Sequence, residues 1–487
     1  MQKTFNCITC VGMPFRSRVQ RGNVHRALGE WVIGLMRRRK RPVNPLLFAV
    51  GKCVSARYQV CLTSMGSPSK SRLGVLTVGM GAVATTLYAG VEALRRGLTP
   101  GIGSFTQMGR VPLAARPGTP SRPVLEMLDL AKPEDMVFGG WDLVETDAYS
   151  AAARARVLSP ADLASHRKFL SSIKAFRGIA DPAFTTRLKV VHAKPPAGRH
   201  AQAEAIRGDI RLFRRRNRCA RLVVLSCMSV EVYAPLGSAH RSGAAFEAAL
   251  KADDPSISPS QIYAYAAIAE GVPFINGTPN PTVESPAIRE LARRRGVPLA
   301  GSDFKSGQTY LKTVIAAGLR NRLLGLTGWF STNILGNRDG EVLEDPSALM
   351  AKKETKTRVL ADICRADLYP SLYGGLEHLV TISFFAPRGD NKEAWDSVDL
   401  VGWLGYPMQL KINFECRDSI LAAPLALDLV LLADLAARDK ASGALEWLSF
   451  YFKAPVARGG RPPGNDPNVQ LALLERHVAR LARRRRR

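Results

Sequence analysis

The sequence predicts an α/β protein with a doubly wound parallel sheet, and three observations support this prediction. Apolar strands that end in glycine-rich or polar turns occur at residues 73–81 and 221–233. Helix-rich intervals occur at residues 147–158 and 261–272, and strands that alternate with helices form parallel sheets. A chain of 487 residues with 46% hydrophobic content can also bury the cores of two or three domains.

The net charge of +28 is concentrated at the two ends of the chain. Residues 1–70 contain 13 Lys or Arg against the single acid Glu30, and residues 483–487 are all arginine. Charge confined to the tails argues against a folded face that binds nucleic acid. We predict that residues 1–70 form a disordered extension, or that translation starts at Met65. A basic arm that binds nucleic acid is the alternative interpretation of the same residues.

The cysteines and the apolar segments indicate the compartment. Eight cysteines are scattered without a dense framework, which is typical of free thiols in a reducing environment. Cys7 and Cys10 form a lone CxxC with no second pair at zinc-finger spacing, so the metal content stays unknown. The pattern shows no apolar run long enough to span a bilayer and no signal peptide. We therefore expect a cytoplasmic protein with no membrane or nucleic-acid partner.

A glycine turn follows the first clear strand. Gly79, Gly81 and Ala84 form a GxGxxA pattern between an apolar strand and an apolar-periodic helix. The first glycine permits a tight turn, the second lets the backbone approach a pyrophosphate, and the small third residue lets the helix pack on the strand. This context predicts a dinucleotide site. No acid follows at the usual distance of about twenty residues, so the ribose must be bound by other groups.

The segment 301–313, GSDFKSGQTYLKT, has an unusual concentration of polar groups. Asp303, Lys305, Ser306 and Gln308 lie on a turn flanked by glycines. The segment has too few apolar residues for a core strand. It is either a turn that holds a ligand or a solvated loop that leads into a surface helix.

Lysines and aspartates recur beside turns and helix starts in the second half of the chain. Lys453 directly follows the aromatic residues 450–452, where partly apolar neighbours would favour a neutral, proton-carrying amine. The alternative is a side chain that reaches out to water. Asp418 and Ser419 begin a long apolar helix, where helix capping alone would also explain the aspartate.

Taken together, these segments resemble the inositol-3-phosphate synthase (myo-inositol-1-phosphate synthase) family of the shorter bacterial type. The resemblance runs from about residue 73 to about residue 482, with the motifs in the order that the family has. They are GxGxxA followed by TT at 79–86, GGWD at 139–142, FINGTPNPT at 274–282, GSDFKSGQT at 301–309, LGNRDG at 335–340, a Lys-x-x-x-Lys run at 352–356, GDNKEAWD at 389–396, RDSILAAPLALDLV at 417–430 and KAP at 453–455.

The resemblance implies a Rossmann-like doubly wound parallel sheet with an inserted α+β domain for catalysis and oligomerisation. The implied organisation is an NAD-binding domain at 71–275, an inserted catalytic and tetramerisation domain at 276–410, a C-terminal segment at 411–482 that returns to the first domain, and the arginine tail. The implied assembly is a homotetramer.

The implied activity is the NAD-dependent conversion of D-glucose 6-phosphate to 1D-myo-inositol 3-phosphate. It proceeds by oxidation at C5, enolisation, intramolecular aldol closure and re-reduction, with no net redox change. The resemblance also implies a divalent or monovalent cation, which Asp390 or Asp418 could help to hold. The alternatives are a generic NAD-dependent oxidoreductase that acts on a phosphorylated sugar, and a non-enzymatic basic protein that binds nucleic acid.

The resemblance assigns site residues by motif. The implied catalytic residues are Lys352, Lys453, Asp418, Lys392 and Lys305. The implied cofactor-binding residues are Gly79, Gly81, Ala82, Val83, Asp142, Ser229, Gly277, Asp303, Asp339, Asp390 and Ser419. The implied ligands of the substrate phosphate are Ser306, Gly307, Gln308, Lys356 and Lys392. Two features depart from the family pattern: Arg338 replaces an asparagine, and Lys353 beside Lys352 leaves the register of the lysine run open.

Overall fold

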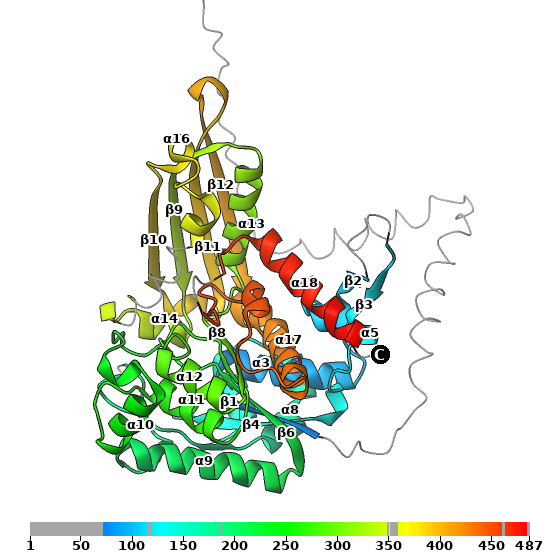
Figure 1. Cartoon of the computed structure of the whole chain (residues 1–487), viewed down its shortest axis with the longest axis vertical. Helices are drawn as coiled ribbons and strands as arrows, with labels where there is room; N and C mark the ends of the chain where they lie inside the picture. Colours follow the sequence, from blue (N-terminus) through cyan, green and yellow to red (C-terminus); the bar gives the residue numbers. More distant parts are fainter. Residues whose placement is uncertain are drawn as a thin grey trace, which may run out of the picture. The chain divides into compact units, whose positions relative to one another are not determined.

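The computed structural model describes residues 72–113, 119–185, 187–347, 350, 359–459 and 463–484. All of them belong to one compact unit, residues 68–487. The predicted disordered extension and the alternative start at Met65 lie outside the described residues. The described part of the chain contains two larger sheets and their helices (Figure 1).

A seven-stranded sheet forms the first layer, and every strand pair in it is parallel. Its strands, in spatial order, are β13 (Gly443–Ala444), β8 (Pro298–Gly301), β7 (Phe274–Asn276), β6 (Cys219–Ser226), β1 (Arg72–Val78), β4 (Met136–Asp142) and β5 (Ala175–Arg177). The interior strand β1 is buried on both faces, as its continuous apolar sequence predicts. The predicted doubly wound parallel sheet is confirmed.

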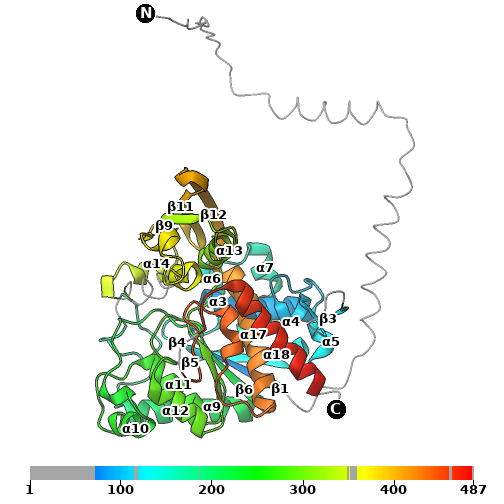
Figure 2. The same ribbon diagram turned by 45° about the horizontal axis from the view of Figure 1, so that its top comes forward.

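Helices cover both faces of this sheet (Figures 1 and 2). Leu73 and Val75 of β1 pack into one apolar core with α3 (Ala82–Arg95), α17 (Asp418–Arg438) and α18 (Pro467–Arg484). Leu76 and Val78 point to the other face, because side chains alternate along a strand. There they join the core formed with α9 (Arg199–Arg216), α10 (Gly243–Lys251), α11 (Pro259–Ala269) and α12 (Pro286–Arg294).

The other helices and strands of the described part of the chain are shorter, apart from those of the second sheet described below. They are α4 (Phe105–Met108), β2 (Arg110–Pro112), β3 (Ser121–Pro123), α5 (Val124–Met127), η2 (Pro133–Asp135), α6 (Ala148–Ala155), α7 (Pro160–Ser165), α8 (Arg167–Ser172), η3 (Ser238–His240), α14 (Arg338–Leu343), α16 (Pro370–Tyr373), η4 (Ala386–Arg388), η5 (Trp403–Gly405) and η6 (Glu446–Tyr451).

A four-stranded mixed sheet forms the second part of the unit. In spatial order its strands are β10 (Glu377–Phe384), β9 (Gly325–Leu335), β11 (Asn391–Val401) and β12 (Pro407–Arg417). The pair β9 and β10 is parallel, whereas β11 is antiparallel to both of its neighbours. Helix α13 (Gln308–Asn321) packs its Ala316 and Ala317 against Trp329 and Val398 on one face of this sheet. This is the α+β insertion that we predicted.

The chain changes from one sheet to the other later than predicted. Residue 275 was the predicted end of the first domain, yet β8 continues the seven-stranded sheet to Gly301. The predicted return at residue 411 is also early, because β12 remains in the four-stranded sheet until Arg417. Helix α17 and β13 then rejoin the first layer.

Helix α17 corrects the expectation that no apolar segment could span a bilayer. Its 21 residues are long and apolar enough by length and composition. In the fold, 67% of its most apolar 18-residue stretch is buried inside the protein, between α3 and the strands of the seven-stranded sheet. Among the described residues, it is the one helix that passes this test.

Asp428 connects α17 to the loop that contains α4, and it gives a stability prediction. The buried carboxylate accepts hydrogen bonds from Phe105 N at 2.7 Å, Thr106 N at 2.9 Å and Thr106 Oγ1 at 2.6 Å, and a further one from Ser104 Oγ. Asp428→Ala would leave these buried donors without their acceptor, so we expect the free energy of unfolding to fall by about 3 kcal/mol or more.

Urea unfolding followed by tryptophan fluorescence measures this loss. Asp439→Ala is the matched control, because Asp439 lies at the end of the same helix and forms only an exposed ion pair with Arg484. We expect the control to change stability by less than about 0.5 kcal/mol. Equal, small effects of the two substitutions would contradict the role given to Asp428.

Candidate functional site

The glycine turn lies between β1 and α3. Gly79 has φ +84°, and a Cβ there would lie 2.8 Å from Met228 Cα, so only glycine fits. Helix α3 begins at Ala82 with Gly81 as its N-cap, and no side chain caps it. A Cβ on Gly81 would meet no atom within 4 Å. The start of α3, with Ala82 and Val83, therefore combines free backbone N–H donors with open space, as a pyrophosphate requires.

Asp142 fixes this turn from the neighbouring strand. The carboxylate, at the end of β4, accepts from Met80 N at 2.8 Å through Oδ2 and from Val144 N at 2.8 Å and Glu145 N at 3.0 Å through Oδ1. Both oxygens thus hold backbone N–H groups of the two turns. The predicted place of Asp142 beside the cofactor site is consistent with this geometry, and its direct part is to shape the turn.

Ser229 and Gly277 follow the ends of β6 and β7 at the same edge of the sheet. Gly277 N donates to Ser226 O at 2.9 Å, and a Cβ on Gly277 would lie 2.3 Å from Phe304 Cζ. Ser229 O accepts from Asn280 Nδ2 at 3.3 Å. The carboxyl edge of an open parallel sheet is where such folds bind ligands. The structure therefore brings these two residues to the edge that also carries the glycine turn.

The segment 301–305 pairs with a segment about 150 residues further along the chain. Ser302 N donates to Ala454 O, Lys453 N to Asp303 O and Lys305 N to Tyr451 O, each at 2.8 Å. This pairing places Lys453 Nζ 2.9 Å from Asp303 Oδ1. Both side chains are less than 10% exposed. Lys453 therefore does not reach out to water, and the segment is not a solvated loop.

A second ion pair connects the four-stranded sheet to helix α17. Lys392 Nζ, at the start of β11, lies 3.0 Å from Asp418 Oδ2, at the start of α17. A Cβ on Gly307 would lie 2.3 Å from Asp418 Oδ1, so this carboxylate lies directly against the beginning of α13. Asp418 is not the N-cap of α17, because Arg417 occupies that position. Capping alone therefore does not account for Asp418.

Asp390 and Ser419 lie next to this ion pair. Asp390 Oδ1 accepts from Asn337 Nδ2 at 2.9 Å and from Ser419 Oγ at 3.2 Å. Burial, reinforced by the charge of Asp418, raises the pKa of Asp390 to about 6. Its Oδ2 is buried and has no hydrogen-bond partner among the described residues. Asp339 lies in the first turn of α14, two residues after Asn337.

The start of α13 has the donors that a phosphate requires. Gly307 is its N-cap and no side chain caps the helix. The first intrahelical bond returns from Leu311 N to Gly307 O, which leaves the backbone N–H groups of the first turn without intrahelical partners. The side chain of Gln308 is turned elsewhere, because its Nε2 donates to Asp396 Oδ2 at 2.9 Å. Ser306 and Gly307 precede this turn directly.

Lys305 is buried among amide groups. It is 2% exposed, and its Nζ donates to Gln470 Oε1 and, at 3.4 Å, to Asn465 Oδ1. Burial lowers the pKa of Lys305 to about 7. Asn465 also donates to Lys453 O at 3.0 Å. The contacts of Lys305 therefore support the backbone of Lys453, and its predicted catalytic part stays a prediction.

The pKa of Lys305 predicts a pH-dependent stability. An unfolded lysine keeps its proton up to about pH 10.4, whereas the folded one loses it near pH 7. Between these values the unfolded state binds more protons, so the free energy of unfolding rises with pH by up to about 1.4 kcal/mol per unit. Urea titrations from pH 7 to 9 should show a smaller rise for Lys305→Met. Identical pH slopes in both proteins would contradict the buried, neutral amine.

Lys352 and Lys356, with the neighbouring Lys353, lie outside the described residues, so their predicted roles stay predictions. Lys312 was missed as a site residue. It is 5% exposed, and its Nζ donates to Ser331 Oγ at 2.7 Å. It lies one helical turn after Gln308, which places both side chains on one face of α13. That spacing was the signal that could have found it.

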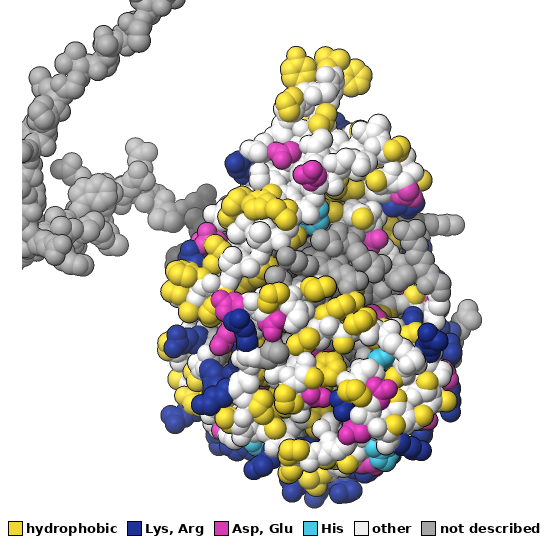
Figure 3. Space-filling model, turned by 90° about the vertical axis from the view of Figure 1, so that its left-hand side faces the viewer, with side chains coloured by type: hydrophobic (Ala, Val, Ile, Leu, Met, Phe, Trp, Pro, Cys, Tyr) yellow, Lys and Arg dark blue, Asp and Glu magenta, His cyan; other side chains and the backbone are white. Residues whose placement is uncertain are grey.

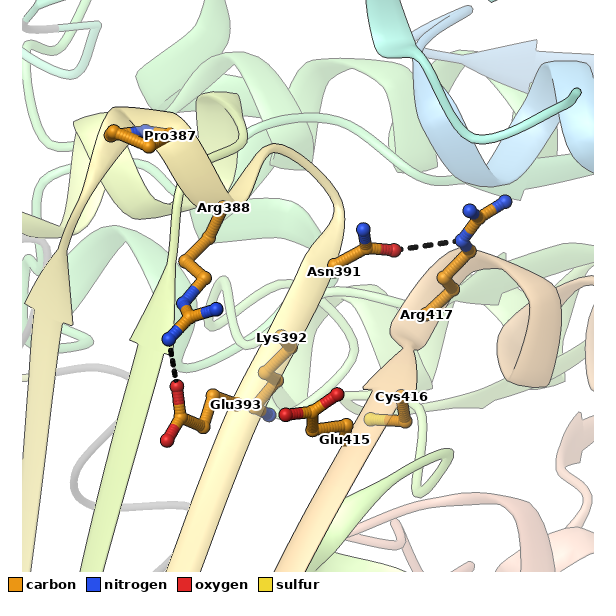
Figure 4. Close-up of a pocket in the computed structure, with 8 residues that line it drawn as sticks. All are labelled: Pro387, Arg388, Asn391, Lys392, Glu393, Glu415, Cys416 and Arg417. Atoms are coloured by element: carbon orange, nitrogen blue, oxygen red, sulfur yellow. Dashed lines mark hydrogen bonds and ion pairs between the residues drawn. The ribbon is translucent and has the colours of Figure 1, made fainter. Parts of the chain in front are cut away.

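A pocket of about 430 Å³ opens beside the ends of β11 and β12 (Figure 4). Two of its polar pairs, Arg388 with Glu393 and Asn391 with Arg417, connect neighbouring segments at its rim. Among the described residues, Lys392 is the one predicted site residue that lines it. Within the described part of the chain, no group of three or more His, Cys, Asp or Glu side chains could hold a metal ion.

Comparison with known proteins relates this geometry to a family. An NAD-binding family model described as myo-inositol-1-phosphate synthase matches residues 73–479. Inositol-3-phosphate synthase 1 of Bacteroides thetaiotaomicron is 47% identical over 410 residues, which cover 84% of this chain and 95% of that protein. Inositol-3-phosphate synthase of Spirodela polyrhiza is 34% identical over 435 residues, 83% of this chain and 84% of that protein.

The solved structures agree. The crystal structure of inositol-3-phosphate synthase from Caenorhabditis elegans superimposes with a TM-score of 0.79 at 28% identity, covering 85% of this chain and 86% of that one. A myo-inositol-1-phosphate synthase-related protein from Thermotoga maritima has the same fold, with a TM-score of 0.65 at 21% identity over 84% of this chain and 98% of that one. The chain belongs to the myo-inositol-1-phosphate synthase family.

Proposed function

We propose that this protein is an NAD-dependent inositol-3-phosphate synthase that converts D-glucose 6-phosphate to 1D-myo-inositol 3-phosphate. Family membership over residues 73–479 supports the proposal. The observation that carries it is the buried Lys453–Asp303 pair at the carboxyl edge of the seven-stranded sheet. Gly277 links this pair to the strand ends near the glycine turn, because its N–H donates to Ser226 O at the end of β6 and its carbonyl accepts from Phe304 N, next to Asp303.

The residues around the glycine turn fit a bound dinucleotide. The uncapped start of α3 and the open space at Gly81 suit a pyrophosphate. Asp142, Ser229, Gly277, Asp303, Asp339 and Ser419 are the further residues that we assign to the cofactor. Bound NAD would supply the two-electron acceptor for the oxidation at C5 and return the electrons at the end of the cycle.

The protein's own groups would bind the sugar and move protons. The backbone N–H groups at Ser306, Gly307 and Gln308 would hold the phosphate, with Lys356 and Lys392 as point charges. Lys453 would hold or move the proton at the C5 oxygen, because the carboxylate of Asp303 keeps its amine in place. A ketone at C5 acidifies the C6 protons, and an ammonium group such as that of Lys352 would stabilise the resulting enolate until it closes on C1. Asp418 would orient Lys392.

A divalent or monovalent cation beside the cofactor is part of the proposal. Asp390 Oδ2 is a buried acceptor without a partner among the described residues, and the charge of Asp418 acts on the same carboxylate. Two close carboxylates attract a cation. Loss of turnover after chelation or ion replacement, with recovery on adding one cation back, would support this site; full turnover in every salt would exclude it.

We also propose that the protein is a cytoplasmic homotetramer. The hairpin between β11 and β12 exposes Trp403 by 87%, Leu404 by 79% and Tyr406 by 68%. Figure 3 shows apolar side chains gathered where this hairpin projects. The outer face of the four-stranded sheet adds the ring pair Phe330 and Trp395, with ring centroids 5.4 Å apart. Exposed apolar area of this kind suits contacts between subunits. Light scattering of the purified protein measures the assembly.

Product analysis tests the proposed activity. Purified protein is incubated with D-glucose 6-phosphate and a small amount of NAD, and the product is identified by NMR. We expect inositol phosphate in large excess over NAD, with no net growth of the reduced-nicotinamide absorbance. Growth of that absorbance in proportion to product would indicate a generic oxidoreductase instead.

A further inference from the structure

A buried polar network lies under the start of α13, on the inner face of the four-stranded sheet. Asp396 of β11 is 3% exposed and accepts from three side chains. Its Oδ2 accepts a hydrogen bond from Gln308 Nε2 at 2.9 Å, and its Oδ1 accepts from Trp329 Nε1 at 2.7 Å and from Ser331 Oγ. Lys312 Nζ donates to the same Ser331 Oγ at 2.7 Å. The network connects an acid, a lysine and the first residue of α13.

The carboxylate decides how the Gln308 amide is turned. An ionised carboxylate only accepts hydrogen bonds, so the amide must present its NH₂ group to Asp396. A second, longer contact from Nε2 reaches Thr332 O at 3.5 Å. Both amide hydrogens therefore face the sheet. The side chain of Gln308 cannot donate to a phosphate in this arrangement, and Oε1 is the one polar atom of its side chain left for a ligand.

This orientation matters for the backbone donors of α13. The backbone N–H groups of a first helical turn can be satisfied by a nearby side-chain acceptor, and the amide oxygen of Gln308, the first residue of α13, is such an acceptor. Such self-capping would occupy the donors that a phosphate needs. The helix start has no side-chain cap, and Gln308 is held away from it. Asp396 thus keeps these donors available.

We propose that Asp396 is a positioning residue of the sugar-phosphate site, which holds the Gln308 side chain against the sheet and so keeps the start of α13 open to the phosphate. The identity of the ligand rests on the proposed function. Lys312 completes the arrangement, because its charge compensates that of the buried Asp396 through Ser331. Its Nζ also lies 2.7 Å from His378 Nε2 and 5.4 Å from the centre of the Trp329 ring.

A double-mutant cycle tests the proposal. In Asp396→Asn, the NH₂ group of the new amide can take the place of the carboxylate oxygen that accepts from Gln308 Nε2. Two NH₂ groups would then face each other, and neither can accept a hydrogen bond. We expect the KM for glucose 6-phosphate and the inhibition constant of inorganic phosphate each to rise about tenfold, with kcat within about threefold of the wild type. In a Gln308→Met background, Asp396→Asn should change neither constant further, because Asp396 acts through Gln308.

Trp329→Phe is the matched control, because it removes a different donor from the same carboxylate. We expect it to lower Tm and to leave KM and the phosphate constant unchanged. Ser331→Ala is the milder variant if Asp396→Asn does not fold, with an expected rise of about threefold in both constants. The proposal would be overturned if Asp396→Asn had equal effects with and without Gln308. It would also be overturned if both constants were unchanged in Asp396→Asn or in Ser331→Ala, or if Trp329→Phe raised them as much as Asp396→Asn does.

Calorimetric titration with inorganic phosphate separates this proposal from the proposed function. If the wild type does not turn over glucose 6-phosphate, the proposed function fails. Phosphate affinity still reports on the start of α13 in that case. If Asp396→Asn weakens phosphate binding when Gln308 is present but not in the Gln308→Met background, the positioning role is supported. If phosphate affinity is the same in the wild type and in all of these variants, the positioning role is refuted.

Discussion

Lys453→Met is expected to abolish the formation of inositol phosphate while NAD binding is retained. The amine lies at the carboxyl edge of the seven-stranded sheet and is held 2.9 Å from Asp303 Oδ1. A positioned proton carrier contributes about 10²- to 10⁴-fold to a rate, and here it would also stabilise charge on the substrate oxygen. We expect kcat to fall by about 10³-fold or more. NAD affinity, measured by calorimetry, should change little.

A loss of stability could imitate this result, and a second variant separates the two effects. Lys453→Met leaves the buried carboxylate of Asp303 without its ammonium partner, which costs about 3–5 kcal/mol. The double variant Lys453→Met with Asp303→Asn removes both charges, so we expect it to recover stability and to remain inactive. Lys251→Met, at the exposed end of α10, is the control for lysine removal. Near-normal turnover in either Lys453 variant would refute its assigned role.

Lys392→Met is expected to have the second-largest effect on turnover. Lys392 contacts Asp418 Oδ2 at 3.0 Å, and Asp418 in turn lies against Gly307 at the start of α13. The substitution would remove one cation from the proposed phosphate site, and with it the ammonium charge beside Asp418. With that charge gone, the carboxylate would repel a phosphate bound at the same helix start more strongly. We expect kcat/KM for glucose 6-phosphate to fall by about 10²- to 10³-fold.

The Lys392 prediction has its own internal control. Lys392→Arg keeps the charge but changes its geometry, so we expect it to recover part of the lost kcat/KM. Asp418→Asn in the Lys392→Met background should recover part of it too, since the repelling charge is gone. Steady-state kinetics over a range of glucose 6-phosphate concentrations measures all three proteins. If Lys392→Met and wild type had the same kcat/KM, the proposed phosphate site would be wrong.

The first layer of the fold could be predicted because its signals are local. The strand at 72–78 and the helix at 82–95 differ in hydrophobic period, and the glycines between them mark the turn. The limits of the insertion were harder. Strand β8 has only four residues, Pro298–Gly301, and it runs directly into the polar segment that follows. Strand β13 has only two, so its pairing with β8 depends on contacts that no local pattern contains.

The site was predicted as a set of residues but not as pairs. Lys453 and Asp303 are separated by 150 positions, and they meet only because residues 302–305 pair with residues 451–454. The sequence alone left Lys453 equally explained by a side chain directed to water. The burial of Lys312 could not be predicted from its own segment, because the sheet that buries it lies later in the chain. Residue types and the order of motifs can be read from local sequence, whereas the contacts between residues that are distant in the chain cannot.

Isotope transfer tests whether the electrons taken from C5 return to the same molecule, as the proposed reaction requires. The protein is incubated with glucose 6-phosphate that carries deuterium at C5 and with a small amount of unlabelled NAD. If the proposed reaction occurs, the deuterium remains, at full occupancy, on the corresponding carbon of the inositol phosphate. Deuterium that accumulates instead on free reduced cofactor, or that is lost to water, would contradict it.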